Sequence, residues 1–367
     1  MRKLKFVIGV LVAACAALAG CTATPNVSNS SARTTLVAPL GSVNTVATIR
    51  AALAAAPRGS QTIQATSDTG TQVFVGPGKY DLGTTPLLIP SCVTLDGTDG
   101  FASRVEFTYE GTGNAIRFYT YAGHGYHEGG AVRNISVVSY DGGIGIDPAV
   151  KQLVCARIEH VYLDCGGTPI KLRIPAANGD DEANVYATQI DDVVIRRCNG
   201  QAVDVAGRIQ HISRLNVCNP TLSGPVTAPK FMPIAMVNLE GSGLCENSWF
   251  EGTFSWPLLR YASGAWTHTN NWLEPHQTSI AQELVDSARV VQDRVIFAEP
   301  EVPVVVRSFS SLTLLEHPTV TDVNGNASTN VAGAFQVDAT SGAALPAQPG
   351  QVMLPALRRD SFHAVTK

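Results

Sequence analysis

Charged residues are scarce in this sequence: Asp, Glu, Lys and Arg make up 15% of its 367 residues, and aromatic residues only 7%. Acidic residues outnumber basic ones, so there is no concentrated basic surface for a phosphate backbone and we expect no nucleic-acid partner. No two cysteines have the CxxC spacing of a zinc site. Glycine, in contrast, is abundant, with 33 residues, a composition typical of turn-rich β-proteins rather than helical ones.

The N-terminus has the pattern of a bacterial lipoprotein signal. A basic start is followed by the apolar run Phe6–Ala19, too short for a membrane-spanning helix, and by Leu18–Cys21, which matches a lipobox. We expect residues 1–20 to be removed and Cys21 to carry a lipid that anchors the chain to a membrane. Thr22 rather than Asp follows, which favours an exported lipoprotein of the outer membrane. The alternative is an ordinary signal peptide with a chance cysteine.

Residues 21–43 are rich in Ser, Thr, Asn and Ala and predict a flexible tether. The stretch Thr71–Gly97 then has three short β-branched runs separated by turn residues. The linkers are too short for the helical crossover that joins parallel strands in an open sheet, and they lack hairpin turns. A solenoid, in which each strand pairs with its equivalent one turn later, satisfies both constraints.

The segment VFVGPGKYDLG…LLIPSCVTLDG resembles the opening coil of the pectate lyase-like superfamily, and TVATIRAALAAAP resembles the helix that covers that coil. The resemblance implies an all-β fold, a single-stranded right-handed parallel β-helix solenoid with an N-terminal capping helix. It covers residues 44–316 and leaves 317–367 as a C-terminal cap and irregular tail. It also implies a polysaccharide partner, but one fold carries many chemistries, so it does not select the reaction.

Four segments have apolar residues at their first, fourth and sixth positions and so predict successive coils. They begin at Ile135, Ile158, Ile190 and Ile212. Cysteines follow the last three of these segments, at positions 165, 198 and 218. Because stacked coils are about 4.8 Å apart, a disulfide between neighbours is possible. A ladder of buried free thiols is the other interpretation.

A clear repeat joins Asn247–Glu251 to Asn270–Glu274, with equivalent residues 23 positions apart. If one coil has this length, Glu251 stacks on Glu274 and Trp249 on Trp272. Two carboxyl groups about 5–5.5 Å apart are the arrangement of a retaining glycoside hydrolase. We therefore predict the glutamates as catalytic residues and the tryptophans as platforms for sugar rings. The alternative is that the tryptophans fill the coil interior and the glutamates are solvated surface residues.

Other residues suit a lyase or an acidic substrate. Arg173 and Arg197 are candidates for substrate binding, or for the base that β-elimination on a uronate polymer requires. His124, in an aromatic and glycine-rich segment, is a further candidate for substrate binding. The acidic pair Asp180 and Asp181 offers oxygen ligands for Ca²⁺, although most acidic loops are simply solvated.

The sequence thus predicts a surface lipoprotein that binds a polysaccharide and hydrolyses it with paired carboxylates. Two alternatives stay open: a polysaccharide lyase, and a solenoid that binds glycans or proteins without cleaving them.

Overall fold

The structure is a computed structural model. It describes residues 34–36, 45–56, 71–97, 105–120, 125–174, 184–221, 235–252, 257–275, 280–298 and 302–306, and the short stretches 310–314, 319–321, 327–328, 335–337 and 362–364. Met1–Ala32 and Arg33–Lys367 form separate units, and the described residues all belong to the second. No helix in the described ranges is long and apolar enough to cross a membrane.

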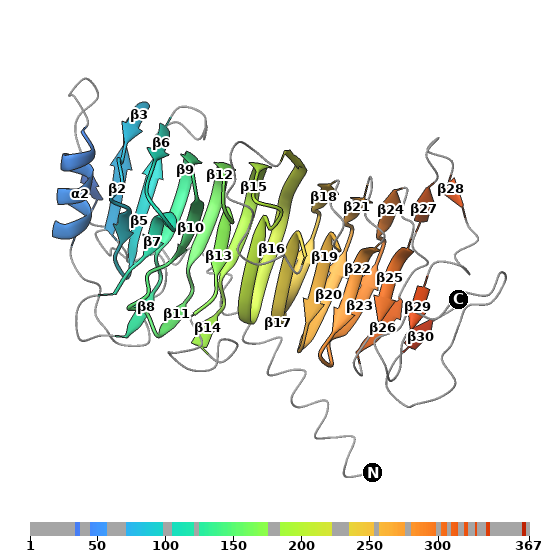
Figure 1. The fold of residues 1–367 in the computed structure, drawn as a ribbon. Coiled ribbons are helices and arrows are strands. Elements are labelled where there is room, and N and C mark those ends of the chain that lie inside the picture. The colour runs from blue at the N-terminus through green and yellow to red at the C-terminus, as the bar shows by residue number, and fades with distance from the viewer. Residues whose placement is uncertain are drawn as a thin grey trace, which may run out of the picture. The chain divides into compact units, whose positions relative to one another are not determined.

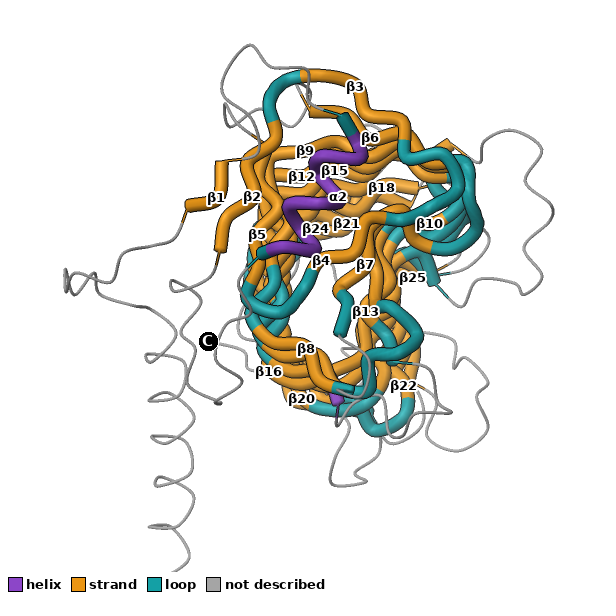
Figure 2. The backbone as a smooth tube through the Cα atoms, turned by 90° about the vertical axis from the view of Figure 1, so that its left-hand side faces the viewer, coloured by secondary structure: helices purple, strands orange, loops and turns teal. Residues whose placement is uncertain are grey.

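The second unit is a right-handed parallel β-solenoid (Figure 1). Each strand pairs with the equivalent strand of the next coil, so the chain winds around one axis and the strands of successive coils overlie one another along it (Figure 2). The strands form three long parallel ladders, here named A, B and C. The predicted fold class is confirmed.

Ladder A contains β1 (Thr34–Leu36), β2 (Thr71–Val75), β5 (Val93–Gly97), the first parts of β9 (Ala131–Ser139), β12 (Arg157–Cys165) and β15 (Gln189–Arg197), the middle of β16 (Val203–Thr221), the later part of β17 (Val237–Glu246), and β20 (Ala265–Thr269), β23 (Arg289–Asp293), β26 (Ser311–Leu314) and β30 (Phe362–Ala364). Ladder B contains β3 (Gly78–Asp81), β6 (Val105–Tyr109), the ends of β9, β12, β15 and β16, and β18 (Trp249–Gly252), β21 (Trp272–Pro275), β24 (Ile296–Ala298) and β27 (Thr319–Thr321), which β28 (Ala327–Ser328) joins in antiparallel orientation.

Ladder C contains β4 (Leu87–Ile89), β7 (Asn114–Phe118), β10 (Gly142–Ile146), β13 (Ile170–Leu172), the first parts of β16 and β17, and β19 (Leu259–Ala262), β22 (Ile280–Val285), β25 (Val302–Val306) and β29 (Phe335–Val337). A short fourth ladder contains β8 (Tyr126–Glu128), β11 (Gln152–Val154) and β14 (Val185–Tyr186). The described strands therefore extend beyond residues 44–316 at both ends, through β1 and through β27–β30.

The apolar repeat is confirmed in three of its four copies. Ile158, Ile190 and Ile212 stack in one column. The first copy was placed wrongly: the residue in register with Ile158 is Val132 rather than Ile135, and Ile135 stacks on Val161. The error arose because Ile135, Val138 and Tyr140 also match the pattern, yet Tyr140 is 75% exposed and Val138 is only half-buried.

The predicted capping helix is α2 (Val46–Ala55), which lies across the first end of the coil stack in Figure 2. Thr45 is its N-cap, and the Thr45 and Thr48 side chains form a reciprocal capping box. Ile49 and Leu53 are its buried residues and pack on the solenoid core. The helix thus covers apolar surface at an end that no further coil covers.

The solenoid interior is a continuous column of inward side chains from all three long ladders. The six described cysteines are free thiols, so the structure has the thiol form rather than disulfides. Cys165 and Cys198 are buried, and the register between β12 and β15 places them in neighbouring coils. Cys218 does not continue this column, because the register instead pairs Arg197 with Thr221.

Candidate functional site

The bend between ladders A and B determines which side chains face outward. One residue per coil at this bend has a left-handed φ of 48–57°: Asn134, His160, Asp192, Arg214, Asn247, Asn270 and Arg294. The extra residue at the bend explains why the apolar repeat has a spacing of three and then two. Asn tolerates this conformation better than most residues, and Asn270 Nδ2 also donates a hydrogen bond of 2.6 Å to Asn247 Oδ1.

The next position of the repeat points inward and ties coils together. Asn271, 2% exposed, accepts a hydrogen bond from the Ser248 backbone N–H and donates one to the Cys245 carbonyl, each over 2.8 Å. Ser248 Oγ in turn accepts from the Leu215 N–H over 3.1 Å. Buried backbone groups at the bend are therefore satisfied by side chains of the adjacent coil.

The two tryptophans of the repeat face outward. Trp249 is 43% and Trp272 39% exposed, whereas Phe250 and Leu273, one position later, are buried. The indoles belong to residues paired across β18 and β21, and their ring centroids are 6.3 Å apart at an interplanar angle of 53°. The interpretation that the tryptophans fill the coil interior is therefore wrong, since the period-two alternation gives the interior to Phe250 and Leu273.

Glu251 and Glu274 are paired in the same ladder, as the spacing of 23 predicted. Both follow an inward residue and are half-buried on the outer side of ladder B. Paired positions of neighbouring strands are about 4.8 Å apart, so the carboxyl groups start close to the spacing of a retaining pair. Trp272 Nε1 donates a hydrogen bond of 3.1 Å to Glu274 Oε2, which orients one of the two carboxylates.

The preceding coils extend this polar surface. Cys218 and Glu251 each follow one member of the register pair Val217 and Phe250. Burial raises the pKa of the Cys218 thiol, and the Glu251 carboxylate raises it further. Burial also raises the pKa of Tyr162, with opposing contributions from Arg196 and Asp164. We name the surface formed by Trp249, Glu251, Trp272 and Glu274 together with Tyr162, Asp164, Arg196, Arg197 and Cys218 the ladder B site.

The two predicted arginines lie in different places. Arg197 belongs to the ladder B site, where its guanidinium forms an ion pair with Asp164. Arg173 follows β13 of ladder C and is not near the tryptophans in register. Its guanidinium binds Asp204 and Glu240, the latter over 2.7 Å.

Burial lowers the pKa of the Arg173 guanidinium, but the neighbouring Asp204 and Glu240 carboxylates raise it by more. Arg173 is therefore held as a cation and is poorly suited to act as a base. The network continues on ladder C: Asn238 donates to Asp204, and Arg260 donates to Asn238 and contacts Asp286. No motif in the sequence predicted this network. A charged residue between two apolar ones, Asp204 between Val203 and Val205, is a signal that indicates it.

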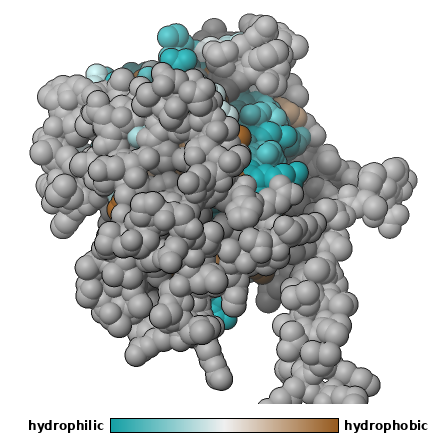
Figure 3. All heavy atoms as spheres, turned by 90° about the vertical axis from the view of Figure 1, so that its right-hand side faces the viewer, coloured by the Kyte–Doolittle hydropathy of each residue, from teal (hydrophilic) through white to brown (hydrophobic). Residues whose placement is uncertain are grey.

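The remaining predicted residues, Cys21, His124, Asp180 and Asp181, lie outside the described residues. Within the described ranges, no group of three or more His, Cys, Asp or Glu side chains has an arrangement suited to a metal ion. Seen from the C-terminal end, the described part of the surface is mostly hydrophilic, teal in Figure 3, with isolated hydrophobic atoms.

Comparison with known proteins gives structural similarity alone. No family model matches the sequence, and no curated protein matches it. Among solved structures, the chain is similar to ORF18 of Geobacillus virus E2 with 10% identity and a TM-score of 0.37, over 84% of this chain and 62% of that one. The chain therefore spans less than two thirds of the length of that protein. At this level of similarity we draw no functional conclusion from the match.

Proposed function

We propose that the ladder B site binds a polysaccharide and hydrolyses its glycosidic bonds. The observation that carries the proposal is the stacking of Trp249 on Trp272 and of Glu251 on Glu274 on one outer face. Large aromatic side chains left 39–43% exposed in pairs are unusual on a surface without a ligand. Their flat apolar faces suit the C–H faces of sugar rings, and the two carboxyl groups lie on the same side of the sheet.

The contacts suggest a role for each carboxyl group. The Trp272 N–H orients Glu274 through its hydrogen bond to Oε2, so we assign Glu274 as the nucleophile that attacks the anomeric carbon and forms a glycosyl-enzyme. Glu251 then protonates the departing glycosidic oxygen and, as its carboxylate, removes a proton from the water that hydrolyses the intermediate. Retention of anomeric configuration is the expected outcome.

The test is incubation of the chain with a panel of neutral and acidic polysaccharides. We expect new reducing ends without ultraviolet absorbance, and loss of at least about 100-fold in rate for Glu251→Gln and for Glu274→Gln. Glu106→Gln is the matched control, because Glu106 is an outward glutamate of ladder B in a distant coil. Products that absorb in the ultraviolet would identify a lyase instead. Binding without cleavage would identify a glycan-binding solenoid.

We also propose that the chain is exported and anchored through a lipid on Cys21, on the strength of the lipobox. Growth with an alkyne-labelled fatty acid should label the wild-type chain and leave Cys21→Ser unlabelled. An unlabelled wild-type chain in the soluble exported fraction would contradict this proposal.

A further inference from the structure

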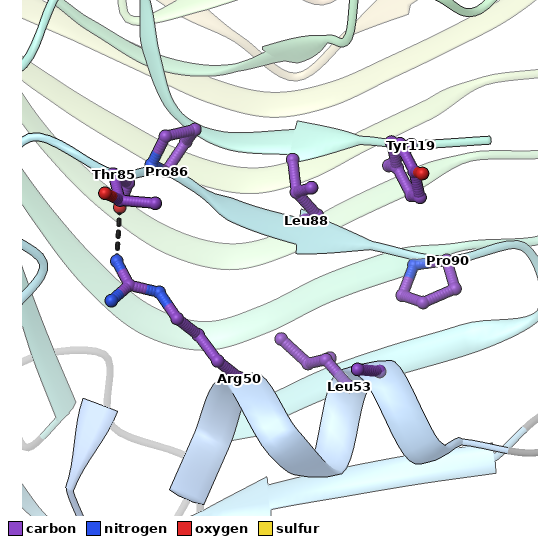
Figure 4. A pocket seen from close by; sticks show the side chains of 8 residues that line it. Arg50, Leu53, Thr85, Pro86, Leu88, Pro90 and Tyr119 are labelled. Atoms are coloured by element: carbon purple, nitrogen blue, oxygen red, sulfur yellow. Dashed lines mark hydrogen bonds between the residues drawn. The ribbon is translucent and has the colours of Figure 1, made fainter. Parts of the chain in front are cut away.

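A cavity of about 360 Å³ lies between α2 and ladder C, at the N-terminal end of the described solenoid (Figure 4). The coils of β9, β12 and β15 lie between it and β18 and β21, the strands of Trp249 and Trp272 (Figure 1). It is formed where α2 crosses the open edge of the first coil without filling the space above β4. The residues that line it are Arg50, Leu53, Ala54, Thr85, Pro86, Leu88, Pro90 and Tyr119. Its volume is within the range of pockets that hold small organic molecules.

The walls of the cavity are largely apolar. Leu53 and Ala54 project from the helix, and Leu88 and Pro90 belong to β4 and the turn after it (Figure 4). The ring of Tyr119, which follows β7, borders the same space. A ligand with an apolar body would therefore exchange water contacts for carbon contacts on several sides.

Arg50 gives the cavity a positive charge at one end. Its Nη2 donates to the carbonyl oxygens of Leu82, over 3.1 Å, and Thr85. These acceptors are neutral, and no carboxylate among the described residues forms an ion pair with Arg50. Its Nε is buried and has no hydrogen-bond partner in the described part of the chain. A partly desolvated cation that has only neutral acceptors is unfavourable unless an anion neutralises it.

We propose that this cavity binds a small organic monocarboxylate with an apolar body of about six carbons, a size consistent with the pocket range. The carboxylate pairs with the Arg50 guanidinium and neutralises it, while the carbon chain or ring packs between Leu53, Leu88 and Tyr119. This site is separate from the ladder B site, and the proposal does not depend on polysaccharide hydrolysis.

Calorimetric titration of the chain with hexanoate and with hexanol tests the proposal. We expect saturable binding of hexanoate that is at least about tenfold tighter than binding of hexanol, the ratio that one hydrogen bond to a charged group supplies. Arg50→Gln should remove this preference, and Ala54→Phe should abolish binding of both compounds by filling the cavity. Arg289→Gln, an exposed arginine of ladder A, is the matched control and should bind as the wild type does.

Arg50→Gln also loses the bonds that join α2 to the turn before β4, so circular dichroism and thermal unfolding must show that the helix is intact. Ala54→Phe keeps those bonds. If the helix loosens in Arg50→Gln, Ala54→Phe therefore decides whether the ligand binds in the cavity. Absence of saturable hexanoate binding, equal affinity for hexanol, or binding that survives Ala54→Phe would each overturn the proposal.

Discussion

Trp272 and Glu274 are joined by a hydrogen bond of 3.1 Å from the indole Nε1 to a carboxylate oxygen. The two side chains are two positions apart on β21 and therefore point to the same side of the ladder. The bond joins the aromatic surface to one member of the carboxylate pair. Trp249 and Glu251 have the same spacing in the coil before, so the two coils present the same pair of residue types.

Trp272→Phe separates the two roles of Trp272, because phenylalanine keeps an aromatic face and removes the N–H. In the proposed hydrolase we expect kcat to fall about tenfold, the order of one hydrogen bond to a charged group at a partly exposed position, with little change in KM. Trp249→Phe is the matched control. It should leave kcat within about threefold of the wild type, because the bond that orients the assigned nucleophile Glu274 comes from Trp272. A change confined to KM in Trp272→Phe would contradict the orienting role. Steady-state kinetics on a soluble oligosaccharide measure both parameters.

The adjacent asparagines Asn270 and Asn271 predict opposite tolerance to substitution. Asn270→Gly should change the free energy of unfolding by less than about 1 kcal/mol, because glycine adopts the left-handed bend without strain. Asn271→Ala should cost about 2–4 kcal/mol, because it leaves the Ser248 N–H and the Cys245 carbonyl buried without partners. Urea unfolding followed by tryptophan fluorescence measures both. Equal losses would show that the inward amide does not tie the coils together.

The stacking of the Trp and Glu pairs was predictable, whereas the direction of the side chains was not. A spacing of 23 residues equals one coil, and the register follows from it. Inward or outward orientation depends on whether the bend takes an extra residue, and Asn247 alone did not establish that it has a positive φ. The same bend accounts for the misplaced first copy of the repeat at Ile135.

The sequence pattern did not predict that Arg173 and Asp204 lie together, and the reason is different. They lie in ladder C, 31 residues apart, and a segment of irregular length separates them. Without a regular repeat across such segments, the sequence does not show which coil each strand joins. The cavity beside α2 has the same origin, since it depends on how the helix crosses β4 rather than on any motif.

The free energy of unfolding should fall as the pH is lowered from about 6.5 to about 4, because two buried histidines resist protonation in the folded state. Burial lowers the pKa of His127 to about 4, against the opposing effect of its 2.8 Å contact with the Tyr119 carbonyl, and burial lowers that of His268 to about 3. In the unfolded chain both titrate near 6.5. Above that pH neither group contributes a pH dependence, whereas between about 6.5 and about 4 the unfolded state takes up protons that the folded state does not.

Each histidine should therefore lower the free energy of unfolding by up to about 1.4 kcal/mol per pH unit within this window. His127→Phe should remove about one proton from the difference between the two states, and its stability should depend less steeply on pH than that of the wild type. Phe118→Leu, which changes a buried ring beside His127 and involves no titratable group, is the control and should keep the wild-type slope. Denaturant unfolding at a series of pH values gives the slopes, and an unchanged slope in His127→Phe would show that this residue does not resist protonation.

The buried thiols should be inert in the folded protein. Burial raises the pKa of Cys198 and of Cys245 to about 12 and raises that of Cys165 further, so almost no thiolate is present near neutral pH. Cys155 is half-buried and should react with an aromatic disulfide reagent in the native state. Cys165, Cys198 and Cys245 should react only after guanidinium is added, and peptide mass mapping identifies the labelled residues. Because Cys165 and Cys198 lie in neighbouring coils, at a spacing that a disulfide can bridge, a bond between them in the native protein would contradict the thiol form. Mapping without reduction detects that bond directly.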